Sequence, residues 1–510
     1  MIKNTHSIQK VFLEIDTSSM VMANAIKNNL AVFLQNEVVP ILENQFNQIE
    51  NIDNQIIQID KLEISIDSND AKNDLYFSDE IKNKIEKEVQ KTLNKLQKTT
   101  KNKGENELDI LTISPEDKEL KTLLYFIENG SMPWWVSNIN EVHFLKETNL
   151  DRFKNDLFRI PFFKLIKEKK VQSRIINQFS NPEIAVLIST VLNSENQQKA
   201  LSKNNLLQLL DQKTYGFKAA FWQLIFDFWM EKKPISLIAF YHKEQDQFPS
   251  DKISFELFIQ NIKSFVPLDL DEKELIQMES DYLVSEKEKQ ITKPDPDTKP
   301  DTNKEENKSE SGIEINSEKD KTIIKNNDQL KETQSENDPF EDDKQSSIYC
   351  YVQNAGLIIL HPFLKELLKS CRLIDDSNTF LDKELAAHIL HYAATKKEND
   401  YEHLMLFEKF LCGIPLHQSI KREIKIEDKH KQQVEEMLDS VVLHWSALKN
   451  TSTAVLRSEF LQREGKLDWS ESNPKLSIER KTQDLLLEKI PWNITIVKIP
   501  WIQKLIYTQW

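Results

Sequence analysis

The stretch KPDPDTKPDTNKEENKSES, Lys293–Ser311, decides how this chain is organised, because it cannot contribute to a hydrophobic core. It lies within a segment, 285–347, that carries 11 Lys against 18 Asp plus Glu and only seven large apolar residues. Such a segment buries too little apolar surface to offset the entropy of ordering its backbone. We therefore predict a disordered acidic linker over 285–347, with an ordered part on either side.

The first residues of the chain predict a small α/β unit over 1–70. Two stretches alternate between apolar and polar residues, as β-strands do. Their apolar members are Val11, Leu13 and Ile15 in the first stretch and Ile57 and Ile59 in the second. Between them, apolar residues recur at helical spacing from Met22 to Leu34, so we expect a strand, a helix and a second strand.

A longer helical domain is predicted over 71–284. It opens with a helix from Ser78, whose charged surface carries one narrow apolar stripe. The stripe consists of Ile81, Ile85, Val89, Leu93 and Leu96. Helical periodicity resumes near Pro115 and continues almost to the linker, with Pro133 and Pro182 as natural breaks.

Order is expected to return after the linker, over 348–510. Helical periodicity is present in four stretches, 357–368, 385–394, 401–411 and 427–448. The last residues are rich in aromatic and β-branched types, which favours one or two short strands around Ile494, Ile496 and Tyr507. The predicted fold is therefore mainly α, with a small N-terminal α/β unit, short strands near the C-terminus and two ordered parts joined by the disordered linker.

The charge and hydropathy of the chain exclude several classes of protein. The net charge of −15 opposes general nucleic-acid binding, which requires concentrated Lys and Arg. No stretch approaches about 18 uninterrupted apolar residues, so we expect no membrane insertion. The first ten residues lack the apolar core of a signal peptide, which predicts a cytoplasmic protein. Three cysteines, Cys350, Cys371 and Cys412, fit reduced thiols better than a disulfide framework.

Glycine is scarce, with seven in 510 residues and no two of them close together. A phosphate-binding P-loop and a GxGxxG dinucleotide turn both require clustered glycines, so neither motif can be written anywhere in the chain. We therefore expect no nucleotide cofactor of these classes. The low glycine content also favours long helices over turn-rich sheets.

The strongest candidate for a metal site is AAHILHYAAT, in which His388 and His391 would share one helical face. His403, Cys412 and His417 could complete a tetrahedral set. However, the spacing matches no familiar zinc pattern, and helical histidines usually satisfy local hydrogen bonds, so we predict no metal. Cys412 beside His417 could also act as a nucleophile, but a buried cysteine before a capping glycine is the favoured interpretation.

Charged residues near the C-terminus resemble a catalytic group only because they stand among apolar ones. They are Glu479, Arg480, Lys481, Glu488 and Lys489. A solvated face or interface ion pairs is the favoured interpretation. We therefore predict no catalytic residues and no enzyme.

Tryptophan is concentrated in two runs. Trp134 and Trp135 in MPWWV are adjacent and cannot easily both face one core, so one of them could mark a protein-interaction surface. The second run, PWNITIVKIPWIQKLIYTQW, holds Trp492, Trp501 and Trp510 and must be buried in its own domain or against a partner. Core packing is favoured, and protein interaction stays open for all five.

Several unrelated motifs occur in an order that is typical of one family. The two most specific are HWSALKNTSTAVLRSEFLQREGKL, 444–467, and LSIERKTQDLLLEKIPWNITIVKIPW, 476–501. The others are HSIQKVFLEID, IIQIDKLEISI, LLYFIENGSMPWWV, NAGLIILHPFL, HILHYAAT and FLCGIPL. Together they resemble a bacterial family, the contractile injection system tape measure proteins.

This resemblance implies a structural or assembly component of a phage-tail-like machine, in which a tape measure helps to set tube and sheath length. The implied partners are the inner tube, the baseplate hub or the cap, and no catalytic residues are implied. The alternative is an adaptor or assembly chaperone that binds tube, cap, baseplate or effector proteins without setting length. If the linker is the measuring segment, deletion of 293–337 should shorten the particles.

Overall fold

The computed structural model describes residues 32, 34–48, 56–59, 62–65, 79–100, 110–136, 152–192, 204–231, 233–244, 254–264, 272–291, 349–449 and 451–510, with single positions 6, 8, 11, 139, 142, 144, 145, 246 and 266. The predicted first strand beyond Val11, the predicted helix from Met22 to Leu30 and the predicted linker after Ile291 lie outside these residues. The described part is mainly helical, with short strands near both ends, which confirms the predicted fold class.

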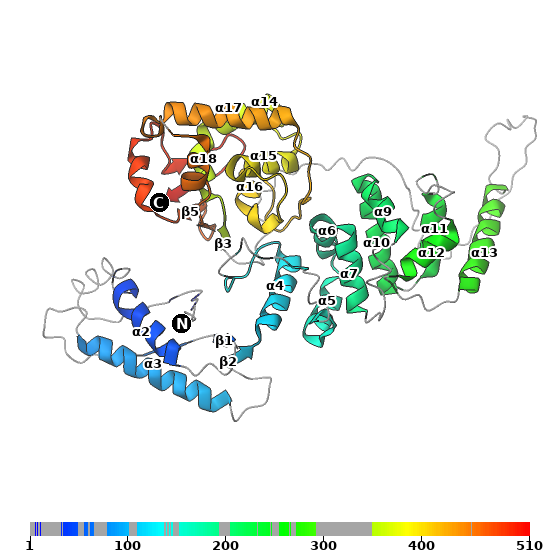
Figure 1. The fold of residues 1–510 in the computed structure, drawn as a ribbon, viewed down its shortest axis with the longest axis horizontal. Coiled ribbons are helices and arrows are strands. Elements are labelled where there is room, and N and C mark those ends of the chain that lie inside the picture. Colours follow the sequence, from blue (N-terminus) through cyan, green and yellow to red (C-terminus); the bar gives the residue numbers. More distant parts are fainter. Residues whose placement is uncertain are drawn as a thin grey trace, which may run out of the picture. The chain divides into compact units, whose positions relative to one another are not determined.

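The chain forms two compact units, and the first of them is discontinuous in sequence (Figure 1). The first unit combines 1–202 with 346–510, and the second consists of 203–345. The division predicted from the sequence, with boundaries after residues 70, 284 and 347, stays a prediction. None of the described helices is long and apolar enough to cross a membrane.

The N-terminal elements form a two-stranded ribbon and a helix pair. They are η1 (a π-helical turn, Leu34–Val38), α2 (Val39–Gln48), β1 (Ile56–Ile59), α3 (Asp79–Thr100) and β2 (Ile110–Ile113). β1 pairs antiparallel with β2, with Ile57 opposite Thr112. The narrow stripe of α3 buries Ile85, Val89 and Leu93 against α2 and β1. β1 and α3 confirm two predicted elements. β2 was missed because its four residues become a strand only through pairing with β1.

Four helices follow, and the sequence itself starts and ends them. They are α4 (Pro115–Asn129), α5 (Asp156–Leu165), α6 (Lys169–Gln178) and α7 (Asn181–Val191). Ser114 caps α4 by accepting a hydrogen bond from the Asp117 amide, and Ser180 forms a capping box with Glu183 at α7. Gly130 ends α4 in a left-handed conformation, φ 74°, which a residue with a side chain adopts less readily.

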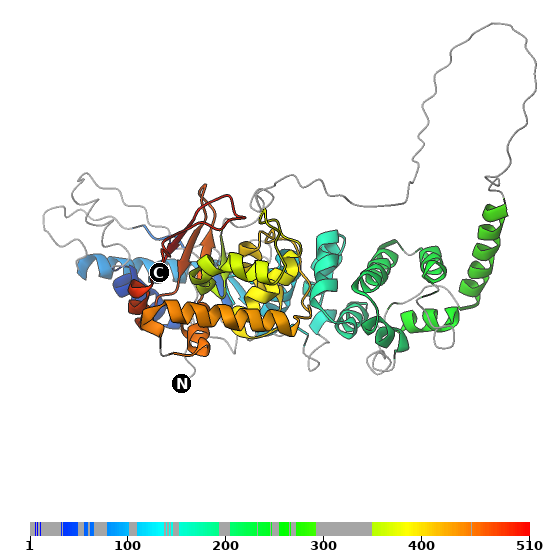
Figure 2. The ribbon, with the colours of Figure 1, turned by 90° about the horizontal axis from the view of Figure 1, so that it is seen from above.

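The described residues of the second unit form helices (Figure 2). Its elements are α9 (Asn205–Asp211), α10 (Tyr215–Glu231), α11 (Pro234–Lys243), α12 (Phe255–Lys263) and α13 (Glu272–Ile291). Fully buried aromatic residues, Phe221, Trp222 and Phe226 of α10 with Phe258 of α12, fill its core. α13 continues to Ile291 and so overlaps the start of the predicted linker, since Glu, Lys and Gln are strong helix formers.

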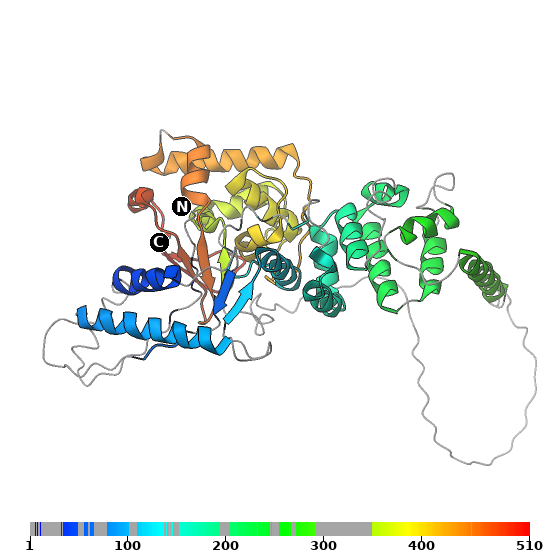
Figure 3. The same cartoon turned by 60° about the horizontal axis from the view of Figure 1, so that its bottom comes forward.

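Residues 349–510 contribute a five-stranded sheet to the first unit (Figure 3). Its strands are β3 (Tyr349–Val352), β4 (Gly465–Asp468), β5 (Lys475–Ile478), β6 (Ile496–Val497) and β7 (Ile506–Gln509), in the order β3-β4-β5-β7-β6. All pairs are antiparallel except β5 with β7. The short strands predicted near the C-terminus are confirmed as β6 and β7, whereas β3, β4 and β5 were missed.

Helical elements complete this part of the unit. They are η5 (Ala355–Leu360), α14 (His361–Ser370), α15 (Lys383–Thr395), η6 (Glu402–Leu404), α16 (Leu406–Leu411), α17 (Asp428–His444), η7 (Ser446–Leu448), α18 (Thr453–Leu456), η8 (Arg457–Leu461) and η9 (Thr482–Lys489). The four helical stretches predicted after residue 348 are confirmed. η5 passes so close to η8 that a Cβ at Gly356 would lie 1.7 Å from the Phe460 carbonyl oxygen, so only glycine fits there.

Candidate functional site

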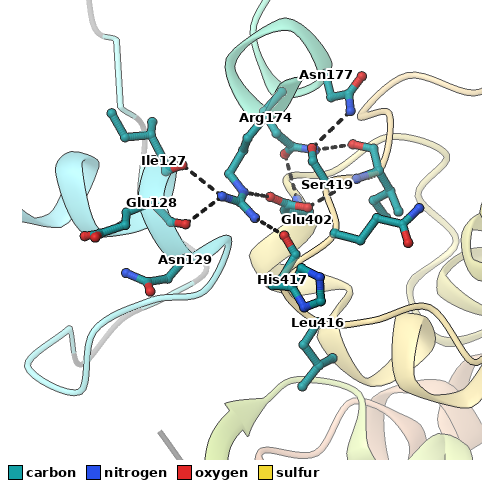
Figure 4. Close-up of polar contacts among 12 residues, drawn as sticks. Ile127, Glu128, Asn129, Arg174, Asn177, Glu402, Leu416, His417 and Ser419 are labelled. Atoms are coloured by element: carbon teal, nitrogen blue, oxygen red, sulfur yellow. Dashed lines mark hydrogen bonds and ion pairs between the residues drawn. The ribbon is translucent and has the colours of Figure 1, made fainter. Parts of the chain in front are cut away.

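A buried ionic cluster joins α6 to a segment more than two hundred residues further along the chain (Figure 4). Arg174 Nε lies 2.5 Å from Glu402 Oε1, and Lys409 Nζ lies 3.4 Å from Glu402 Oε2. All three side chains have no solvent exposure. Burying charges in this way is costly unless each group is paired and hydrogen-bonded.

The Arg174 guanidinium donates to backbone carbonyls in addition to Glu402. Nη1 donates to the carbonyl oxygens of Ile127 and Glu128, at 2.9 and 2.8 Å, and Nη2 donates to that of His417, at 2.5 Å. Ile127 and Glu128 lie in the last turn of α4, where carbonyls lack partners within the helix. Arg174 therefore closes the end of α4 and holds it against α6 and the distant segment.

Lys409 donates to backbone carbonyls in the same way. Its Nζ donates to the carbonyl oxygens of Leu416 and Gln418, at 2.8 and 2.6 Å, and the Ile420 amide donates to Glu402 Oε2 at 3.3 Å. Two cations thus share one carboxylate, and backbone carbonyl dipoles compensate the second positive charge. Every nitrogen of the two cationic groups and both carboxylate oxygens make at least one of these contacts.

Further polar contacts on α6 extend the cluster. Gln178 accepts a hydrogen bond from the Glu402 amide at 2.8 Å and donates to the Ile420 carbonyl at 2.7 Å. Asn177 Nδ2 donates to Ser419 Oγ at 3.1 Å. We call the whole set the α6 clamp: Arg174, Asn177 and Gln178 with Glu402, Lys409 and the segment 416–422. These contacts fix the register of α6 on that segment.

An aromatic cluster lies beside the α6 clamp. The ring centroids of Phe126 and Phe179 lie 6.0 and 6.1 Å from that of Tyr401, and Phe126 lies 5.4 Å from His403. Arg422 stacks on Tyr401, 4.0 Å from the ring centroid. Burial lowers the pKa of His403 to about 3, and the Ile139 backbone raises it only in part, so the imidazole is neutral and packs as an aromatic ring.

Gly130 shows how tightly the clamp is built. Besides its positive φ, a Cβ at this position would lie 2.8 Å from Glu402 Oε1 and 2.9 Å from Arg174 Nε. The αL end of α4 is thus what lets the ion pair approach the helix terminus.

The histidines of AAHILHYAAT have local partners. His388 Nδ1 lies 3.1 Å from the Glu398 carbonyl oxygen, and its Nε2 lies 2.7 Å from that of Lys421. Burial lowers the pKa of His388, and the two carbonyls raise it in part. Within the described residues, no group of three or more His, Cys, Asp or Glu side chains is arranged to hold a metal ion.

His391 is held between two carboxylates. Its Nδ1 lies 2.9 Å from Glu408 Oε1, and its Nε2 lies 3.3 Å from Asp400 Oδ2. Burial lowers the pKa of His391, but the hydrogen bonds and charges of Asp400 and Glu408 raise it by more, to about 9. Asn354, at φ 52°, donates to Glu408 Oε1 at 2.8 Å and completes this buried polar group.

The surroundings of Cys412 and of the charged residues near the C-terminus give little support to a catalytic role. Cys412 is fully buried, and burial together with the Glu408 charge raises the pKa of its thiol, which opposes a nucleophilic role. Gly413, at φ 63°, follows it as the expected capping glycine. The charged residues 479–481 and 488–489 are all exposed, and the pair between Lys481 and Glu479 spans 3.7 Å.

Trp134 and Trp135 are both half-buried in the turn after α4. Their rings meet edge to face, with centroids 5.9 Å apart. Trp135 Nε1 donates to Thr122 Oγ1 at 3.3 Å, and its ring contacts Tyr125, so Trp135 packs on α4.

The three C-terminal tryptophans are also half-buried. Trp492 Nε1 donates to the Ile359 carbonyl at 2.9 Å, and Trp501 Nε1 donates to the Leu411 carbonyl at 2.6 Å. Trp510 Nε1 is buried and has no hydrogen-bond partner among the described residues. Trp492 and Trp501 are thus each held by a backbone carbonyl, and all three tryptophans keep some accessible surface.

Sequence reasoning missed the α6 clamp altogether. Arg174, Glu402 and Lys409 stand in ordinary charged stretches, and no spacing links positions so far apart. The buried pair Arg463 and Asp484, 2.7 Å apart, was missed for the same reason.

Comparison with known proteins agrees with the motif resemblance. A family model described as contractile injection system tape measure protein matches residues 5–510, nearly the whole chain. No curated protein and no solved structure matches significantly.

Proposed function

This chain belongs to the contractile injection system tape measure protein family, and we propose that it is built into the particle as a structural component that helps to set tube and sheath length. The family match over residues 5–510 carries this proposal, because it covers both compact units rather than one motif. The partners of the chain are other proteins of the injection system. We propose the inner tube, the baseplate hub or the cap as direct contacts.

The proposal includes synthesis in the cytoplasm and incorporation into a phage-tail-like particle. The half-buried tryptophans are the proposed contact points: Trp134, Trp135, Trp492, Trp501 and Trp510. Support comes from their exposure, because tryptophans with one packed and one accessible side are typical anchors of protein interfaces.

The test is the distribution of sheath lengths, measured by electron microscopy, in particles from cells that lack the gene and from the same cells complemented with it. We expect missing particles or a broad length distribution without the gene, and one uniform length after complementation. Particles of uniform, normal length without the gene would contradict a length-setting role. Fewer particles, all of normal length, would instead support the adaptor or chaperone alternative.

A further inference from the structure

We infer that segments 115–191 and 349–510 of the first unit remain packed together while the protein functions; we call this unit closed. Residues 203–345 are then an excursion, a segment whose two ends both lie on the first unit. This inference rests on the proposed function and deepens it, because it restricts how the chain can contribute to length. A chain stretched between two separate ends would require 115–191 and 349–510 to come apart.

The contacts that join these two segments are numerous and specific. Arg174 contacts Glu402 and the His417 carbonyl, and Asn177 contacts Ser419. The Arg422 amide donates to the Asn177 carbonyl at 2.9 Å, so backbone as well as side chains is paired across the joint. These are contacts within the first unit, made between positions on opposite sides of the excursion.

Separation of the two segments would cost free energy in two ways. It would break buried ion pairs, and it would expose apolar side chains to water. Water would rehydrate Arg174 and Glu402 and thereby offset part of the ionic cost. It would not compensate the exposure of Phe126, Phe179 and Tyr401, all of which are at most 7% exposed in the closed unit. The aromatic cluster therefore makes the joint part of a hydrophobic core rather than a detachable contact.

Closure has a geometric consequence for length measurement. An extended chain spans at most about 3.3–3.6 Å per residue. Both ends of the excursion lie on one body, so the chain must go out and come back. Its farthest point therefore lies at a distance from that body of no more than half the contour length of the excursion. We therefore expect the excursion to contribute to length as a segment with both ends on one body, and not as a thread between two anchored ends.

The test is a reversible lock on the joint in the full-length chain. Asn177→Cys with Ser419→Cys replaces two side chains that are in contact across the joint, with Asn177 Nδ2 and Ser419 Oγ 3.1 Å apart. Cys350→Ser removes the half-buried native thiol, whereas Cys371 and Cys412 are buried and stay. The two single-cysteine chains in the same background are the matched controls. The genes are expressed in cells with an oxidising cytoplasm, and cross-linking is read from the gel mobility of the chain.

We expect the cross-linked chain to support particles in normal yield, with a mean sheath length equal to that of the single-cysteine controls. Loss of particles or a changed length that reverts in a reducing cytoplasm would show that the joint must open, and would overturn the inference. If the double variant does not cross-link or does not fold, Arg174→Met decides, with Lys170→Met on the same helix as its control, because it weakens the joint directly. Particle yield below that of Lys170→Met supports the inference. Particles in the same yield and of the same length as with Lys170→Met contradict it.

Failure of the inference is distinguishable from failure of the proposed function. The proposed function fails only if particles of normal, uniform length form without any copy of the gene. The inference fails when the gene is required but only the unlocked chain supports normal particles.

Discussion

Arg174 shows at the scale of a single residue how a charge can be kept in a core. It is fully buried, yet its donors reach Glu402 and three carbonyls from two distant segments. A well-packed apolar side chain would avoid the desolvation cost, but it would not distinguish one register of α6 from another. We therefore interpret the buried arginine as a determinant of which segments pack together.

Arg174→Met should strongly destabilise the first unit, by roughly 3–5 kcal/mol, because it leaves Glu402 buried and short of a partner. Lys170→Met on the same helix is the matched control, since its pair with Glu168 is about half exposed and should contribute less than about 1 kcal/mol. The measurement is urea or thermal unfolding of both variants beside the wild type. Equal losses of stability in the two variants would refute the role assigned to the clamp.

His391 should make the stability of the first unit pH-dependent on the alkaline side. Its pKa in the folded chain, about 9, lies above the ordinary value of 6.5, so the folded state favours the protonated form. The stabilising contribution is therefore fully present below about pH 6.5 and is lost as the pH rises through about 9, with an upper limit on the order of 3 kcal/mol.

The measurement is the melting temperature of wild type and His391→Gln over that pH range. The charged neighbours Asp400, Glu408 and Lys397 remain in both chains, so the difference between the two isolates His391. The gap should be widest near neutral and mildly acidic pH and should narrow toward pH about 9 and above. A gap that stays constant across the range would contradict a raised pKa of His391 in the folded chain.

At the scale of elements, the crossing of η5 and η8 depends on one missing side chain. Gly356→Ala would place a Cβ 1.7 Å from the Phe460 carbonyl oxygen, which is backbone and cannot turn aside. We expect a loss of at least about 1–3 kcal/mol as the two elements are pushed apart. Gly216→Ala is the control, because a Cβ there meets nothing within 4 Å.

The two glycine variants should therefore differ in their effect on the free energy of unfolding. Gly356→Ala should lower it, and Gly216→Ala should not. Gly216 lies in the first turn of α10, where alanine is the better helix former, so its substitution should be neutral or stabilising by up to about 1 kcal/mol. Thermal unfolding of the purified chains measures both effects. Similar melting temperatures for the two variants would mean that η5 and η8 can separate without cost.

At the scale of the whole molecule, the first unit is discontinuous in sequence. We therefore predict that the two fragments remain associated when the chain is cut once within the excursion. A specific protease site inserted between residues 300 and 310 allows one cut in the purified protein. The two fragments should co-elute in size-exclusion chromatography, because the α6 clamp and the aromatic cluster join them without the connecting chain.

Arg174→Met in the same cut chain is the informative comparison. It should weaken the complex, so that its fragments separate at a lower urea concentration than those of the otherwise unchanged cut chain. Fragments that separate at once without denaturant would show that the two segments do not form one body, and would also remove the basis for the out-and-back excursion.

The sequence by itself determined much of the local structure. Helical periodicity resumes near Pro115, where α4 begins, the stripe of Ile85, Val89 and Leu93 marks α3, and the same periodicity located the helices after residue 348. These signals are readable because amphipathic spacing involves residues within a few positions of one another. The family resemblance was equally readable, because it depends on ordered motifs rather than on contacts.

Only the tertiary structure decided which segments belong together. Strands β3, β4 and β5 carry four residues each, too few for a periodic signal, and they become strands by pairing between positions 349–352, 465–468 and 475–478. The ion pair of Arg174 with Glu402 joins residues 228 positions apart. The sequence around each of these residues resembles that around an exposed charged residue. Their burial and their ion pair arise only when the chain folds. The sequence thus determines the elements and the family, and long-range packing makes one body from segments on both sides of the excursion.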